Sequence, residues 1–138
     1  MINMIIKPKP GDSGYGGHIS DAVLASWFEN ARSPILRIFS PENKAEHTAF
    51  PLINSSTEYN HIDRIDHRYK VEICSWISHI GVYSFTVYQE ARQDGPDSRS
   101  GLCVSCSAVM THYDFGDNKH TPLPQNKKNR LKEFLIEG

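Results

Sequence analysis

The chain has 138 residues, 38% of them hydrophobic, and its 15 Lys and Arg against 16 Asp and Glu give a formal net charge of -1. This length predicts a single domain over residues 1–138 and excludes a two-domain enzyme. Because the charge is nearly balanced, we expect no nucleic-acid partner and no attraction to acidic membranes. The sequence contains three cysteines, no signal-peptide core and no apolar run long enough to span a membrane. These features predict a soluble cytoplasmic protein with no membrane partner.

The N-terminal region predicts a strand followed by an unusual loop. Residues 2–7 are rich in β-branched side chains and indicate an edge strand, which Pro8 and Pro10 end. Residues 11–18 contain four glycines, as expected of a backbone that lies close to a ligand or of a flexible turn. The loop matches neither of the common glycine-rich phosphate-binding patterns.

Residues 20–39 have a helical period, because apolar side chains recur every three or four positions. Ser20 is a suitable N-cap, and Asp21 complements the helix dipole in the first turn. Since few positions are polar, we expect the helix to be mostly buried. Pro34 is expected to kink or split it.

The remaining sequence predicts strands and a short final helix. Alternating apolar and polar side chains indicate strands over residues 69–79, 83–87 and 102–111. Residues 92–99 form a candidate hairpin loop, and residues 125–136 predict an amphipathic helix. A long buried helix followed by an antiparallel meander defines an α+β fold in which the sheet wraps the helix. Its open edges predict dimerisation through an edge or through the helix-bearing side.

Three segments have the order and spacing of a known family's motifs. Residues 17–24 (GHISDAVL) lead into residues 27–32 (WFENAR), residues 80–85 read IGVYSF, and Val109-Met110 precedes a proline-containing tail. They resemble the hotdog-fold acyl-CoA thioesterases of the 4-hydroxybenzoyl-CoA thioesterase type. The matching motifs there are Gly-His-Val-Asn-Asn, a helical Glu-x-Ala-Arg and an Ile-Gly-x-x-Ser hairpin. The resemblance extends over nearly the whole chain.

The resemblance implies a hotdog fold, a homodimer or homotetramer, and hydrolysis of an acyl-CoA or another acyl thioester at the subunit interface without a cofactor. A carboxylate near the start of the helix would act as base or nucleophile. A backbone N–H at the helix N-terminus would polarise the thioester carbonyl, as its unpaired donors and dipole allow. By resemblance, the substrate would be bound by Tyr15, Gly16, Gly17 and Ser84, and the carbonyl by the His18 amide.

The sequence departs from the family at the expected catalytic carboxylate. Many relatives carry an aspartate four residues before the histidine, and Gly14 occupies that position here. The candidate catalytic residues are therefore His18, Asp12, Asp21 and Glu29. Each has a structural alternative, because the His18 ring is dispensable if its amide acts alone, and Asp21 also serves as a helix-start residue. Glu29 is expected to pair with Arg32 at i+3.

We expect no metal site. Cys103 and Cys106 form Cys-x-x-Cys, but the motif lies within a predicted strand, where residues three apart face opposite sides, and no second ligand pair completes it. No sequence motif indicates a serine or cysteine nucleophile.

Two alternatives to hydrolysis remain open. One is a non-catalytic acyl-thioester-binding or dimeric interaction protein, in which Gly14 marks a lost catalytic residue. The other is a hotdog hydratase or dehydratase, for which we identify no acidic partner for His18.

Overall fold

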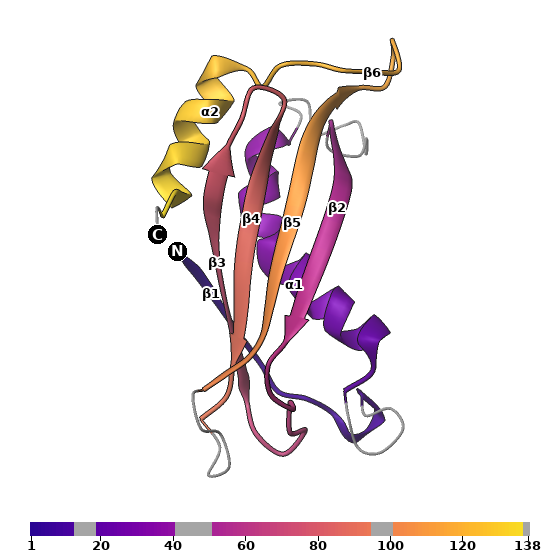
Figure 1. Cartoon of the computed structure of the whole chain (residues 1–138), viewed down its shortest axis with the longest axis vertical. Coiled ribbons are helices and arrows are strands. Elements are labelled where there is room, and N and C mark those ends of the chain that lie inside the picture. Colours follow the sequence, from indigo (N-terminus) through magenta and orange to yellow (C-terminus); the bar gives the residue numbers. More distant parts are fainter. Residues whose placement is uncertain (13–18, 41–50, 95–100, 137–138) are drawn as a thin grey trace.

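The computed structural model describes residues 1–12, 19–40, 51–94 and 101–136. Five antiparallel strands form a sheet in the order β1-β3-β4-β5-β2, and a short sixth strand pairs with β5. Figure 1 shows this curved sheet lying across helix α1 (Asp21–Leu36). The strands are β1 (Ile2–Ile6), β2 (Leu52–His61), β3 (Val71–Ile80), β4 (Ser84–Arg92), β5 (Leu102–Asp114) and β6 (Lys119–His120). The expected α+β hotdog arrangement and the expected edge strand at residues 2–7 are confirmed.

Helix α1 begins where the sequence predicts. The Ser20 side chain accepts a hydrogen bond from the Val23 amide at 3.3 Å, as an N-cap does. The buried apolar residues of the helix are Leu24, Trp27, Phe28, Ala31 and Ile35. Their spacing turns one wide apolar face towards the sheet, so burial of this face holds α1 in place.

Replacing Ser20 with alanine should lower the free energy of unfolding by about 1 kcal/mol, because the Val23 amide loses its acceptor. Urea unfolding measures this change. Ser26 also lies on α1 but is exposed, and its hydroxyl donates to the Val23 carbonyl, so Ser26→Ala is the matched control. An equal loss in both variants would contradict the capping role.

The helix is not split at Pro34, since the α-helix continues to Leu36 and one 3-10 turn (Arg37–Phe39) follows. Proline has no N–H to give to the carbonyl four residues earlier, which here belongs to Asn30. The Ser33 hydroxyl donates to that carbonyl instead, at 3.0 Å. A local side-chain bond therefore satisfies the group that proline leaves open.

The central strands bury alternate side chains against α1. On β4 these are Phe85, Val87, Gln89 and Ala91, each 0% exposed. Tyr83, which was expected to continue this face, lies before the strand and is 49% exposed. Burial of this β4 face contributes to the core between sheet and helix, and α1 also packs against β1 and β3.

Cys103 and Cys106 do not face opposite sides, contrary to expectation. The register between β4 and β5 changes from Ala91↔Val104 to Arg92↔Leu102, which leaves Cys103 in a bulge. Both cysteines are 1% exposed and belong to the same apolar cluster. The bulge interrupts the two-residue alternation on which the expectation depended.

A buried polar network connects α1 to the sheet. The Gln89 amide nitrogen donates to the Phe28 carbonyl at 2.9 Å and to the Ser75 hydroxyl at 3.0 Å. Its oxygen accepts from the Arg32 guanidinium at 3.3 Å. Gln89, Ser75 and Arg32 are respectively 0%, 0% and 3% exposed. Because buried polar groups need partners, this network fixes the helix relative to β3 and β4.

The C-terminal helix is shorter than predicted. Helix α2 (Gln125–Leu131) is followed by a 3-10 turn (Lys132–Phe134), and the Ile136 amide then donates to the Ile77 carbonyl at 2.9 Å. Leu131 is 0% exposed and anchors α2 in the core. The C-terminal segment thereby covers the part of β3 that lies beyond its pairing with β1, which ends at Ser75.

Candidate active site

A pocket of about 510 Å³ lies beside the N-terminus of α1. Its walls combine apolar side chains with charged and polar ones from α1, the end of β2, the loop that follows β2, and β5. They are Ile19, Asp21, Leu24, His61, Ile62, Asp63, Arg64, Ile65 and Val104. An apolar cavity with a few polar groups is typical of a small-molecule site.

The first turn of α1 supplies hydrogen-bond donors at this pocket. The Val23 amide is bonded to the Ser20 side chain and the Leu24 amide to the Ser20 carbonyl. The amides of Asp21 and Ala22 have no acceptor among the residues described. Unpaired amides at a helix N-terminus, with the helix dipole behind them, stabilise a developing negative charge.

Asp21 is the only one of the four expected catalytic residues for which the structure shows a place on this pocket. It is the first residue of α1 and is exposed. Its own backbone amide is one of the two unpaired amides at this pocket.

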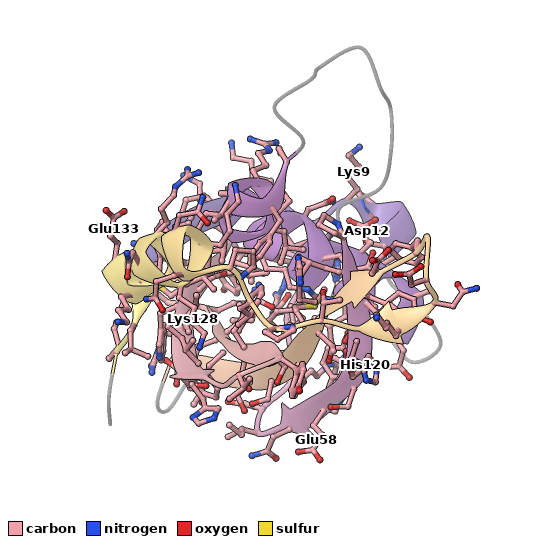
Figure 2. All side chains as sticks on the ribbon, turned by 90° about the horizontal axis from the view of Figure 1, so that it is seen from above. Lys9, Asp12, Glu58, His120, Lys128 and Glu133 are labelled. Atoms are coloured by element: carbon pink, nitrogen blue, oxygen red, sulfur yellow. The ribbon has the colours of Figure 1, made fainter. Side chains whose placement is uncertain are left out.

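Asp12 is near the helix start but belongs to a separate turn. The Ser20 amide donates to the Asp12 carbonyl at 3.1 Å, which ties this turn to the start of α1. The Asp12 carboxylate accepts the Lys9 amide at 2.8 Å, and Figure 2 shows the two residues together. Asp12 does not line the pocket. Its carboxylate has a structural role instead, as the acceptor of the Lys9 amide.

Glu29 lies on the exposed side of α1, two turns after Asp21, and does not line the pocket. The ion pair expected between Glu29 and Arg32, both of which the structure describes, is not formed. Arg32 is buried and donates to Gln89 instead. The i+3 spacing predicted a surface pair, but Arg32 points into the core, where an acceptor on β4 holds it.

Ser84 lies away from this pocket. It begins β4, at the end of the sheet opposite the first turn of α1 (Figure 1), and its carbonyl accepts the Gly81 amide at 2.7 Å. A Cβ added to Gly81 would come within 3.3 Å of that oxygen, so the turn favours glycine. Ser84 and Asp21 of one chain therefore do not meet. The other expected site residues, Tyr15, Gly16, Gly17 and His18, lie outside the described residues, as does Gly14.

Sequence reasoning missed three polar residues of the pocket. His61, Asp63 and Arg64 were not expected at the site, although all three line the cavity. They meet α1 because the Cys103 carbonyl accepts the amides of Ile62 and Asp63, at 2.8 and 3.0 Å. These long-range bonds fold the end of β2 towards the helix, and no local motif encodes them.

The three thiols are buried within the sheet. Burial raises the pKa of Cys74, Cys103 and Cys106, the last to about 11. Their positions and weak acidity do not suit a nucleophile. Among the residues described, no cluster of three or more histidine, cysteine or carboxylate side chains is arranged for a metal ion.

At pH 8 the folded protein should therefore react slowly with a disulfide thiol reagent, because raised pKa values and burial leave little accessible thiolate. After unfolding in urea, all three cysteines should react within minutes. Absorbance of the released aryl thiolate measures both rates. Rapid reaction of one thiol in the folded protein would contradict this assignment.

Comparisons with known proteins agree with this architecture. The family model of the thioesterase-like superfamily matches residues 8–133, so the chain belongs to that superfamily. No curated protein sequence matches. No helix in the described ranges is both long and apolar enough to cross a membrane.

Solved structures share the hotdog fold across nearly the whole chain. A predicted thioesterase from Bacillus stearothermophilus is 22% identical with a TM-score of 0.87, over 99% of this chain and 98% of that one. A thioesterase from Thermus thermophilus, complexed with coenzyme A and Zn, is 18% identical with a TM-score of 0.78, over 95% and 97%. A mutant 4-hydroxybenzoyl-CoA thioesterase, complexed with 4-hydroxybenzoyl-CoA, is 13% identical with a TM-score of 0.77, over 93% and 96%.

Proposed function

We propose that the protein hydrolyses an acyl thioester, with acyl-CoA as the substrate class, in the pocket beside α1. The observation that carries the proposal is the position of Asp21. This residue begins α1, where two backbone amides are unpaired among the described residues, and it lines a partly apolar cavity. Membership of the thioesterase-like superfamily supports this chemistry.

The first turn of α1 and Asp21 have complementary roles. The thioester carbonyl oxygen would accept hydrogen bonds from the amides of Asp21 and Ala22, which stabilise the oxyanion of the tetrahedral intermediate. The Asp21 carboxylate would remove a proton from the attacking water. The new C–O bond forms, the C–S bond breaks, and the leaving thiolate takes up the proton, giving a carboxylic acid and CoA.

The remaining walls provide binding rather than chemistry. Ile19, Leu24, Ile65 and Val104 are buried apolar side chains around the cavity, and Ile62 is 48% exposed at its rim. They would hold the acyl group by excluding water from it. His61 and Arg64 are polar groups on the same wall, suited to hydrogen-bonding the thioester or pantetheine part.

The proposed assembly is a homodimer or homotetramer. Within the described part of the chain, β2 pairs with β5 on one side only, which leaves a ten-residue edge. The pocket lies at the end of this edge, and Tyr59 is 37% exposed along it. A second copy on β2 would therefore border the pocket. Light scattering should give the mass of two or four chains, and the mass of one would contradict this assembly.

Hydrolysis is tested by incubating the wild-type protein with short, medium, long and aromatic acyl-CoAs. Loss of the thioester absorbance band is followed directly, since a thiol reagent could also react with the cysteines. We expect turnover of at least one substrate, with acid and CoA released in equal amounts. Intact thioester in every case would contradict hydrolysis.

The alternative function is non-catalytic binding of an acyl thioester. Gly14 favours it, because by the family resemblance many relatives carry an aspartate, the expected catalytic carboxylate, at that position. Calorimetry with the same acyl-CoAs separates the two functions. Binding without turnover would support the alternative, whereas absence of both would leave only the shared fold.

A further inference from the structure

A second pocket, remote from α1's first turn, has a different chemical character. It encloses about 350 Å³ between the C-terminal segment and the end of β3. Among the residues that the structure describes, its polar lining consists of Ser78, His79, Gln125, Lys128 and Lys132. Each of these side chains can donate a hydrogen bond, and none is a carboxylate. The pocket beside α1, in contrast, has two aspartates on its wall.

The two lysines face the same hollow. Lys128 lies in the last turn of α2 and Lys132 begins the 3-10 turn that follows, and both line the pocket. Neither forms an ion pair among the described residues. Figure 2 shows Lys128 on the side of α2 nearer the sheet, whereas Glu133, the only acidic residue between positions 125 and 136, points outward.

Two like charges on one pocket wall repel each other. The protein as a whole has a formal charge of -1, so these lysines are not part of a generally basic surface. An anion between them would relieve the repulsion.

The sheet contributes the opposite wall through an irregular strand. Between β3 and β4 the register changes from Ile77↔Val87 to His79↔Thr86, which leaves Ser78 in a bulge. Bulges redirect side chains, and both Ser78 and His79 are exposed. Because β1 pairs with β3 only as far as Ser75, this edge faces the C-terminal segment instead. A hydroxyl and an imidazole thus stand opposite the two lysines.

We propose that this pocket binds a phosphate group. The pocket offers hydrogen-bond donors from two ammonium groups, a hydroxyl and an imidazole. A carboxylate has only two oxygens to accept from them. A phosphate monoester has three terminal oxygens and up to two negative charges, so it matches these donors better. Two sources share this chemistry, inorganic phosphate and the 3′-phosphate of CoA. The binding site is independent of the proposed hydrolysis, since its occupancy is measured without turnover.

The test compares CoA, dephospho-CoA and inorganic phosphate by amide NMR of the wild-type protein and by calorimetry. We expect CoA or inorganic phosphate to shift the amide resonances of Ser78, His79 and Lys128. The double variant Lys128→Gln/Lys132→Gln should raise the Kd at least about tenfold, because both charged donors are lost. Binding by CoA but not by dephospho-CoA would identify the 3′-phosphate as the source, and binding by inorganic phosphate would identify the free ion.

The matched control is Lys127→Gln/Arg130→Gln, which removes the same charge from α2 at positions that do not line the pocket. It should retain the wild-type Kd. An equal loss in both double variants would show general charge attraction and overturn the proposal. So would the absence of shifts at Ser78, His79 and Lys128 with all three probes. Retained dispersion in the amide spectrum shows that each variant is folded.

Discussion

Replacing Gln89 with leucine should lower the free energy of unfolding by about 2 to 4 kcal/mol, although the two side chains have similar volumes. Gln89 is 0% exposed and bonds the Phe28 carbonyl, the Ser75 hydroxyl and the Arg32 guanidinium. Leucine would leave these buried groups without their partner. Chemical denaturation of the wild type and variant measures the difference.

A double variant distinguishes this explanation from a packing defect. In Gln89→Leu, the buried Arg32 cation has lost its acceptor. Arg32→Met removes that cation, so Arg32→Met/Gln89→Leu should be more stable than Gln89→Leu alone. Gln125→Leu, at an exposed position of α2, is the control and should change stability by less than about 0.5 kcal/mol. If the double variant loses the sum of the two single losses, the two residues do not act as a network.

Replacing Asp21 with asparagine should lower kcat at least about a hundredfold while KM changes little, because asparagine keeps the shape of the side chain but cannot accept a proton. Steady-state loss of the thioester band measures both constants. Asp12→Asn and Glu29→Gln should retain most of the activity, since neither residue lines the pocket.

Asp117→Asn is the matched control for this series. Asp117 lies in the turn between β5 and β6, is exposed, and contacts Lys119 at 3.9 Å and the Asp114 side chain through its amide. Its kcat should equal that of the wild type. Loss of activity in Glu29→Gln but not in Asp21→Asn would instead place the chemistry at Glu29.

The sequence predicted the elements whose pattern is local. The apolar period of residues 20–39 and the cap at Ser20 indicated α1, and alternation indicated β3, β4 and β5. The resemblance added the hotdog fold, which periodicity alone does not define. The helix is not split at Pro34, where the Ser33 side chain satisfies the carbonyl that proline leaves unbonded.

The site was predicted less completely because its walls come from distant parts of the chain. Asp21 was a candidate from the family resemblance, whereas His61 reaches the same cavity through its pairing with Val104 and Asp63 through its bond to the Cys103 carbonyl. Arg32 was paired with the wrong residue for the same reason, since its acceptor, Gln89, is 57 positions away. Local spacing describes neighbours on one helix and does not show which strand a buried side chain meets.

The most direct test is a crystal structure of the wild-type protein with a ketone analogue of an acyl-CoA, in which a methylene replaces the thioester sulfur and prevents hydrolysis. We predict the carbonyl oxygen at about 3 Å from the amides of Asp21 and Ala22. We also predict the acyl group against Leu24 and Val104, on the wall of the pocket. A carbonyl bound away from the first turn of α1 would contradict the proposed active site.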